Sequence, residues 1–82
     1  MNNSFYNDFA ARFAASTLPS LVRSFNSQVG KRGFNSVRAA HDRALVDELV
    51  RRGVDVSAVF DGTALSFAHH VELDNNRLVI RK

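Results

Sequence analysis

Apolar residues recur at every third or fourth position through the first half of the chain, which is the spacing of a helix with one buried face. The first such segment predicts a helix over about residues 5–15, with Ser4 as its N-cap. Its apolar ridge consists of Phe5, Phe9 and Phe13. Asp8 and Arg12 are one helical turn apart beside the ridge, so we expect them to form an ion pair.

Two more helices follow from the same periodicity. One is predicted over about residues 18–29, and the next over about residues 36–52, where Asn35 or Ser36 can act as N-cap and Gly53 ends the helix. On this third helix one arc of residues is predicted to face the core: Ala39, Leu45, Val46, Leu49 and Val50. All three helices are therefore expected to pack on a common core.

After the third helix the apolar pattern changes to every second position, which is typical of half-buried strands. We expect strands over about residues 54–60, 63–73 and 77–81, joined by tight turns at residues 61–62 and 75–76. Two-residue turns at these places bring apolar residues together on one face of the sheet. The expected pairs are Val56 with Phe67, Ala58 with Leu65, Val71 with Ile80, and Leu73 with Leu78.

The predicted fold class is therefore α+β, with three N-terminal helices packed on one face of a small antiparallel β-meander. An alternative concerns residues 54–60, because Ser57 could begin a single helical turn that ends at Phe60. The meander would then reduce to a two-stranded hairpin. The predicted core comprises Phe9, Phe13, Leu21, Val22, Phe25, Leu45, Leu49, Val56, Leu65, Phe67, Val71, Leu78 and Ile80.

The length of 82 residues corresponds to one domain spanning residues 1–82, and 45% hydrophobic residues are enough for a core. The chain contains no Cys, which excludes disulfides and thiolate chemistry. No apolar run approaches the roughly 20 residues that cross a bilayer. We expect a small soluble protein of the cytoplasm (intracellular), without a membrane contact.

The residues that could carry catalysis or bind a metal do not form a recognisable set. His69 and His70 are neighbours on a predicted strand and point to opposite faces, and the pair His70 and Glu72 lacks a third ligand. His41 and Asp42 are neighbours on a helix, so we expect their side chains to diverge rather than to join Ser66 in a triad. With no glycine-rich nucleotide motif either, we predict no catalytic, metal or cofactor site and no small-molecule substrate.

A basic loop, Gly30-Lys31-Arg32-Gly33, joins the second and third predicted helices of a chain whose net charge is +3. Two glycines let a backbone approach phosphates, and the N-terminus of the next helix favours an anion. The loop resembles the G-x-x-G loop of KH domains, which holds the backbone of single-stranded nucleic acid. The resemblance implies nucleic-acid contacts by Gly30, Lys31, Arg32 and Gly33, with Arg38 on the following helix. The alternative is a helix-capping glycine and a turn glycine on either side of two solvated cations.

Three helices followed by a hairpin are also the outline of a winged helix, with residues 36–52 as the recognition helix. Charges on this helix alternate at i,i+4 spacing, which is typical of a solvated face instead. The four expected ion pairs are Arg38 with Asp42, Arg43 with Asp47, Asp47 with Arg51, and Glu48 with Arg52.

The predicted meander has two open edges that no proline blocks, and such an edge can pair with another chain. The leading hypothesis is a small non-catalytic protein-interaction module that acts as a homodimer, adaptor or inhibitor. Self-association or a protein partner would also enlarge the small core. The alternative is a nucleic-acid-binding protein that uses the basic loop.

Overall fold

The computed structural model describes residues 4–31, 35–62 and 64–81, and in these residues the chain forms three helices followed by a two-stranded hairpin. The elements are α1 (Ser4–Ala14), α2 (Leu18–Gln28), α3 (Ser36–Arg51), β1 (Val71–Asp74) and β2 (Arg77–Ile80). The α+β class and the order of the three helices are as the sequence predicts. The predicted basic-loop residues Arg32 and Gly33 lie outside the described residues.

Local sequence signals set the ends of the helices. The Thr17 side chain accepts a hydrogen bond from the Ser20 amide at 3.3 Å and caps α2. Asn35 caps α3 in the same way, by accepting from the Arg38 amide at 2.8 Å. Gly53 follows α3 with φ at +82°, the left-handed conformation that favours glycine after a helix.

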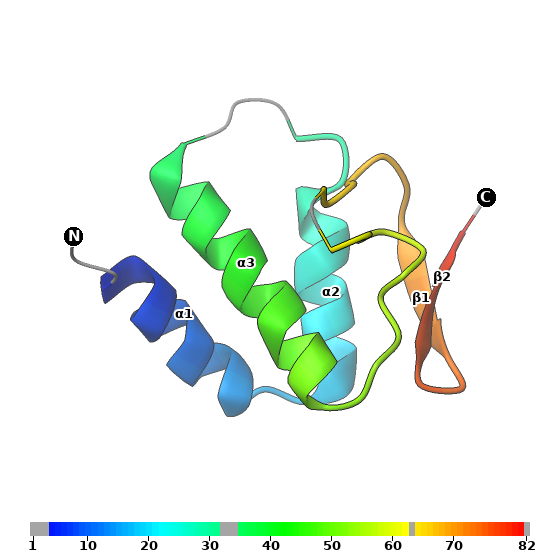
Figure 1. Ribbon diagram of the computed structural model, residues 1–82, viewed down its shortest axis with the longest axis horizontal. Helices are drawn as coiled ribbons and strands as arrows, with labels where there is room; N and C mark the ends of the chain where they lie inside the picture. The colour runs from blue at the N-terminus through cyan, green and yellow to red at the C-terminus, as the bar shows by residue number, and fades with distance from the viewer. Residues whose placement is uncertain (1–3, 32–34, 63, 82) are drawn as a thin grey trace.

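The helices form a layer in which α3 lies between α1 and α2, and the hairpin packs on α2 (Figure 1). Every residue of the predicted core either is buried or packs against the buried cluster. Among the described residues, four further buried apolar side chains were not in the predicted core, although Val46 was predicted to face it: Ala44, Val46, Val54 and Val59. Val50, predicted to face the core, is instead 52% exposed, because it lies on the side of α3 that no other described element covers.

The hairpin of β1 and β2 confirms the register predicted for the last two strands of the meander. Val71 lies opposite Ile80, and Leu73 lies opposite Leu78. The turn consists of Asn75 and Asn76 with φ of +56° and +61°, which is the type I′ geometry that asparagine tolerates.

Residues 56–60 form a single helical turn, so the predicted first strand is wrong and the alternative, a turn that leaves a two-stranded hairpin, is confirmed. The amides of Val59 and Phe60 both donate to the Val56 carbonyl, at 3.0 and 2.9 Å. The carboxylate of Asp55 accepts from the Ser57 amide at 2.9 Å and directs the backbone into this turn. This turn directs Val59 towards the core, and its side chain is buried.

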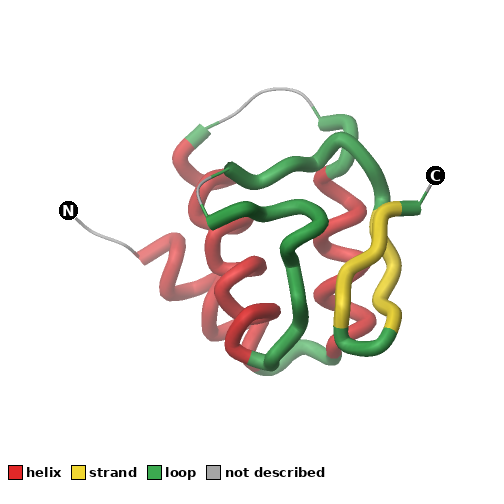
Figure 2. The backbone as a smooth tube through the Cα atoms, turned by 45° about the vertical axis from the view of Figure 1, so that its right-hand side comes forward, coloured by secondary structure: helices red, strands yellow, loops and turns green. Residues whose placement is uncertain are grey.

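The segment before β1 is also largely irregular, as Figure 2 shows. The predicted pairs of Val56 with Phe67 and of Ala58 with Leu65 do not form; an isolated bridge joins Phe60 and Leu65 instead. The side chain of Phe67 packs against Phe25 of α2, with ring centroids 4.6 Å apart. Aromatic packing on a helix thus takes the place of strand pairing.

Candidate functional site

The described part of the predicted nucleic-acid site consists of Gly30, Lys31 and Arg38. Gly30 has φ of +77° and donates its amide to the Phe67 carbonyl at 3.4 Å, so it ends α2 and contacts the loop before β1. Lys31 is exposed. It lines a depression of about 350 Å³ beside the N-terminus of α3, together with Phe9, Gln28, Asn35, Val37, Arg38 and His41.

Arg38 makes contacts within the protein. Its guanidinium donates to the carbonyls of Lys31 and Gln28 at 3.3 and 3.2 Å and lies 3.6 Å from the Asp42 carboxylate. The same group lies 5.9 Å from the centre of the Phe67 ring. Its side chain is only 17% exposed, so Arg38 fastens the end of α2 to α3 rather than facing an external phosphate.

The charges on α3 form most of the expected ion pairs. Arg38 with Asp42, Arg43 with Asp47, and Arg52 with Glu48 are confirmed. Arg51 pairs with Glu48 at 2.5 Å rather than with Asp47. The buried Glu48 carboxylate therefore binds both Arg51 and Arg52. Arg12 of α1 lies 5.5 Å from the centre of the Phe9 ring, and the expected pair with Asp8 is not among the ion pairs of the described residues.

His41 and Asp42 are in contact, which corrects the expectation that they diverge. The Nδ1 atom of His41 lies 3.0 Å from Asp42 Oδ1. The imidazole also meets the rings of Phe9 and Phe13 edge-on, with centroids 5.0 and 5.2 Å away. His41, which Asp42 holds in place, therefore fastens α1 to α3.

Ser66 lies in the irregular loop, where its amide donates to the Val59 carbonyl at 2.8 Å. His69 and His70 are exposed just before β1. Across the described ranges, no group of three or more His, Cys, Asp or Glu side chains could hold a metal ion.

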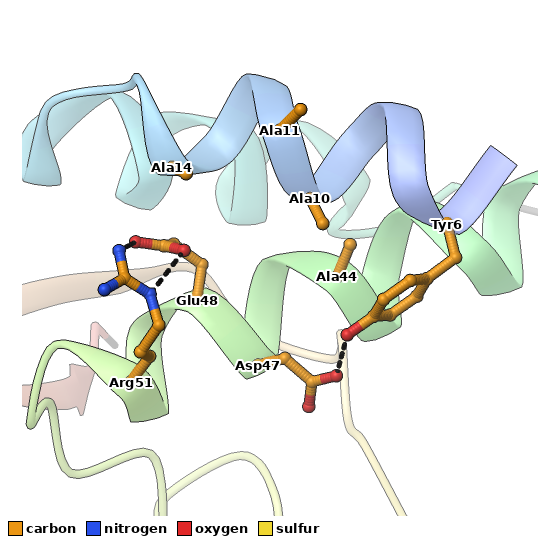
Figure 3. Close-up of a pocket in the computed structure, with 8 residues that line it drawn as sticks. All are labelled: Tyr6, Ala10, Ala11, Ala14, Ala44, Asp47, Glu48 and Arg51. Atoms are coloured by element: carbon orange, nitrogen blue, oxygen red, sulfur yellow. Dashed lines mark hydrogen bonds and ion pairs between the residues drawn. The ribbon is translucent and has the colours of Figure 1, made fainter. Parts of the chain in front are cut away.

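The feature that the sequence analysis missed is a groove between α1 and α3, which we call the alanine groove (Figure 3). One part has a volume of about 370 Å³ and is lined by Tyr6, Ala10, Ala11, Ala14, Ala44, Asp47, Glu48 and Arg51. A second depression of about 450 Å³ shares Tyr6 and Asp47 with the first and adds Ala39, Ala40 and Arg43. Small alanine side chains line the groove, and charged residues of α3 form its rim.

Tyr6 crosses the groove from α1 and donates its hydroxyl to Asp47 Oδ2 at 2.5 Å (Figure 3). This hydrogen bond, followed by burial of the phenol, raises the pKa of Tyr6 above its usual value of 10.0. Arg43 donates to the other Asp47 oxygen at 3.1 Å. Asp47 therefore joins the two walls of the groove.

Glu48 anchors the opposite end of the groove. Its buried carboxylate accepts from Arg51 and from Arg52, and these hydrogen bonds, that from Arg51 foremost, hold the pKa of Glu48 below its usual value of 4.5. The guanidinium of Arg52 also donates to the carbonyls of Phe13 and Ser16, at 2.9 and 2.7 Å. Arg52 thus caps the C-terminal end of α1 with a cation, as the helix dipole favours.

In the amino-acid sequence, the feature that could have indicated this groove is the spacing of alanines. Ala10 with Ala14, and Ala40 with Ala44, each lie one turn apart on the same side of a helix. Alanine is often buried in cores and also has the highest helix propensity on solvated faces, so this spacing alone does not distinguish a groove from an ordinary helix surface.

The edges of the hairpin are less open than the sequence predicts. The Asp55 amide donates to the Asn76 carbonyl at 2.8 Å, and the Asp55 carbonyl accepts from the Leu78 amide at 2.9 Å. On the other strand, the Asn26 side chain binds both the amide and the carbonyl of Val71, at 2.8 and 2.9 Å. These contacts cover part of each edge, so strand addition has little exposed backbone to use.

A scan against protein-family models, a search of curated proteins and a search of solved structures found no match to this chain. In the described part of the chain, none of the helices combines the length and the apolar character needed to cross a membrane.

Proposed function

We propose that the protein is a non-catalytic protein-interaction module that binds an α-helix against α1 and α3. The observation that supports this is the alanine groove, an uncovered seam between two helices that is lined by small side chains. The binding surface, which we call the α1–α3 face, comprises the groove residues together with the exposed Val50.

The dimensions of the groove suit a helix. Helix axes pack at about 8–10 Å, and small side chains at the contact favour the closer distances. The groove follows α3 from Ala39 to Arg51, which corresponds to about 18 Å or three turns. A helix of about twelve residues would lie along its full length.

The rim of the groove defines the chemistry of the bound helix. Arg43 and Arg51 have side chains that are 67% and 64% exposed, and Asp47 lies between them at 41%. A partner helix should therefore present apolar or small residues to the alanines and charged residues of both signs to the rim.

Photocrosslinking tests this proposal. A benzophenone amino acid would replace Ala11 in the groove or, as a control, Ala68, an exposed alanine of the loop before β1. We expect irradiation of the source cells to give a discrete protein adduct from position 11 and none from position 68. Equal labelling from both positions, or none from either, would contradict helix binding at the groove.

Nucleic-acid binding through the basic loop remains the second candidate, and exposed Lys31 beside the N-terminus of α3 favours it. It predicts binding to oligonucleotides that weakens steeply as salt rises and is abolished by the double change Lys31→Asp, Arg32→Asp. Binding that survives this double change would exclude the loop as the contact.

A further inference from the structure

We infer that the helix bound by the α1–α3 face is α3 of a second copy of this chain, arranged antiparallel about a two-fold axis near Leu45. This inference rests on the proposed function because it uses the same face. It is carried by the order of side chains along the exposed side of α3.

One seam of α3 consists of Ala40, Arg43, Asp47 and Val50, of which Arg43 and Val50 are exposed and the other two partly exposed. Their spacing of three, four and three residues places them on one stripe, as at the a and d positions of a coiled coil. The same spacing read backwards is unchanged. An antiparallel copy therefore meets this stripe in a symmetric register.

In this register the side chains complement each other. Arg43 lies opposite Asp47 of the second copy, and Asp47 lies opposite its Arg43, so two ion pairs form across the interface. Val50 lies opposite Ala40 of the second copy, where a large apolar side chain meets a small one. Such large-to-small pairing lets two helices approach closely.

The exposure of these residues in a single copy fits this arrangement. Val50 is 52% exposed, although it is a large apolar residue. The side chains of Arg43 and Asp47 contact each other at 3.1 Å and remain 67% and 41% exposed, so they can exchange partners without being freed from a buried site. An axis at Asp47 instead would place like charges opposite each other, which disfavours that register.

The interface is small. One seam of three helical turns with the adjacent groove buries less than the roughly 1,200 Å² that marks a standard interface, so we expect a dissociation constant in the micromolar range or weaker. Sedimentation velocity up to high concentration should show the mass rise from 9.1 kDa towards twice that value.

Charge reversal provides the decisive test. Arg43→Asp makes the seam acidic and Asp47→Arg makes it basic, so each variant alone should remain monomeric while folded by circular dichroism. An equimolar mixture of the two should form the dimer, because every cross-interface pair is then again of opposite charge. Arg23→Asp, an equal charge change on an exposed residue of α2, should leave self-association unchanged.

Val50→Arg is a second variant in case Asp47→Arg perturbs the fold by removing the Tyr6 hydrogen bond. Because Val50 is exposed, the change should leave the monomer folded and weaken self-association by roughly tenfold or more. A wild-type protein that stays monomeric at high concentration, or variants that all self-associate as the wild type does, would overturn the inference. If the wild type is monomeric yet position 11 crosslinks to a different protein, the second copy is the wrong occupant and the proposed function stands.

Discussion

The two sides of the molecule are held together in different ways. Between α1 and α3, apolar packing includes the edge-on contact of His41 with Phe13 and is reinforced by two polar contacts. These are Tyr6 with Asp47, and Arg52 with the end of α1. Between α2 and the hairpin, the polar attachment rests on the side chain of Asn26. The helical side should therefore tolerate the loss of any one polar contact better than the hairpin side does.

Replacing Asn26 with alanine should have the largest effect. Its amide group satisfies both the amide and the carbonyl of Val71 in a partly buried position, as a neighbouring strand would. Leaving two such backbone groups unpaired should lower the free energy of unfolding by about 2–4 kcal/mol. Urea denaturation followed by circular dichroism measures this change.

Ser27→Ala is the matched control for Asn26→Ala. The Ser27 hydroxyl donates to the Ser24 carbonyl at 2.8 Å on the exposed side of the same helix. Ser27→Ala should therefore lower the free energy of unfolding much less than Asn26→Ala. Equal effects at both positions would show that Asn26 does not hold the hairpin.

Arg52→Ala should lower the free energy of unfolding by somewhat less, about 2–3 kcal/mol. The change removes one of the two arginines that bind the buried Glu48 carboxylate, and it leaves the terminal carbonyls of α1 without a cation. Arg51 provides the comparison, since it binds the same Glu48 but is exposed and makes no hydrogen bond to the described residues of α1. Arg51→Ala should lower the midpoint of thermal unfolding far less. If the two arginine variants melt at the same temperature, the contacts with α1 add no stability.

The same contrast explains how much of the structure the sequence could predict. Helices and the Asn75-Asn76 turn depend on signals a few residues apart, and their positions are confirmed to within a residue or two. The predicted strand over residues 54–60 is wrong for another local reason. The Asp55 carboxylate accepts from the Ser57 amide, and this hydrogen bond favours a turn in a segment whose apolar residues alternate as in a strand. The attachment of Asn26 to Val71 joins residues that are 45 positions apart, and no periodicity reveals it.

The candidate site was harder to predict than the fold. The prediction of the nucleic-acid site rested on positive charge and on glycine flexibility, and it named Gly30, Lys31, Arg32, Gly33 and Arg38. In the structure the guanidinium of Arg38 instead donates to backbone carbonyls of the protein. Conversely, the alanine groove arises only when α1 lies beside α3, because it needs small residues from both helices at the same height.

A smaller effect is expected at the turn of the hairpin. Asn76 has φ of +61°, so Asn76→Ala places a residue with a Cβ atom and no compensating side-chain amide in the left-handed region, at a cost of about 1 kcal/mol. Asn76→Gly should be neutral or slightly stabilising. Thermal unfolding of both variants checks the sign, and a stabilising alanine would contradict the turn geometry.

The smallest effect concerns the hydrogen bond across the groove, and the chain offers a clean signal for it: Tyr6 is the only tyrosine and there is no tryptophan. Because the bond to Asp47 raises the pKa of Tyr6, the near-ultraviolet absorbance of the phenolate should appear above pH 10. The folded protein favours the protonated phenol, so this contribution to stability is complete below about pH 10 and is lost as pH rises through the raised pKa.

Asp47→Asn removes the acceptor charge and should lower the midpoint of the Tyr6 titration towards its usual value, measured in dilute solution where the protein is monomeric. Asp8→Asn, an exposed carboxylate on α1 itself, is the control and should leave the midpoint unchanged. A wild-type titration at the ordinary tyrosine pKa would mean that the groove is open between Tyr6 and Asp47 in solution. The two walls would then rely on apolar packing alone at that point.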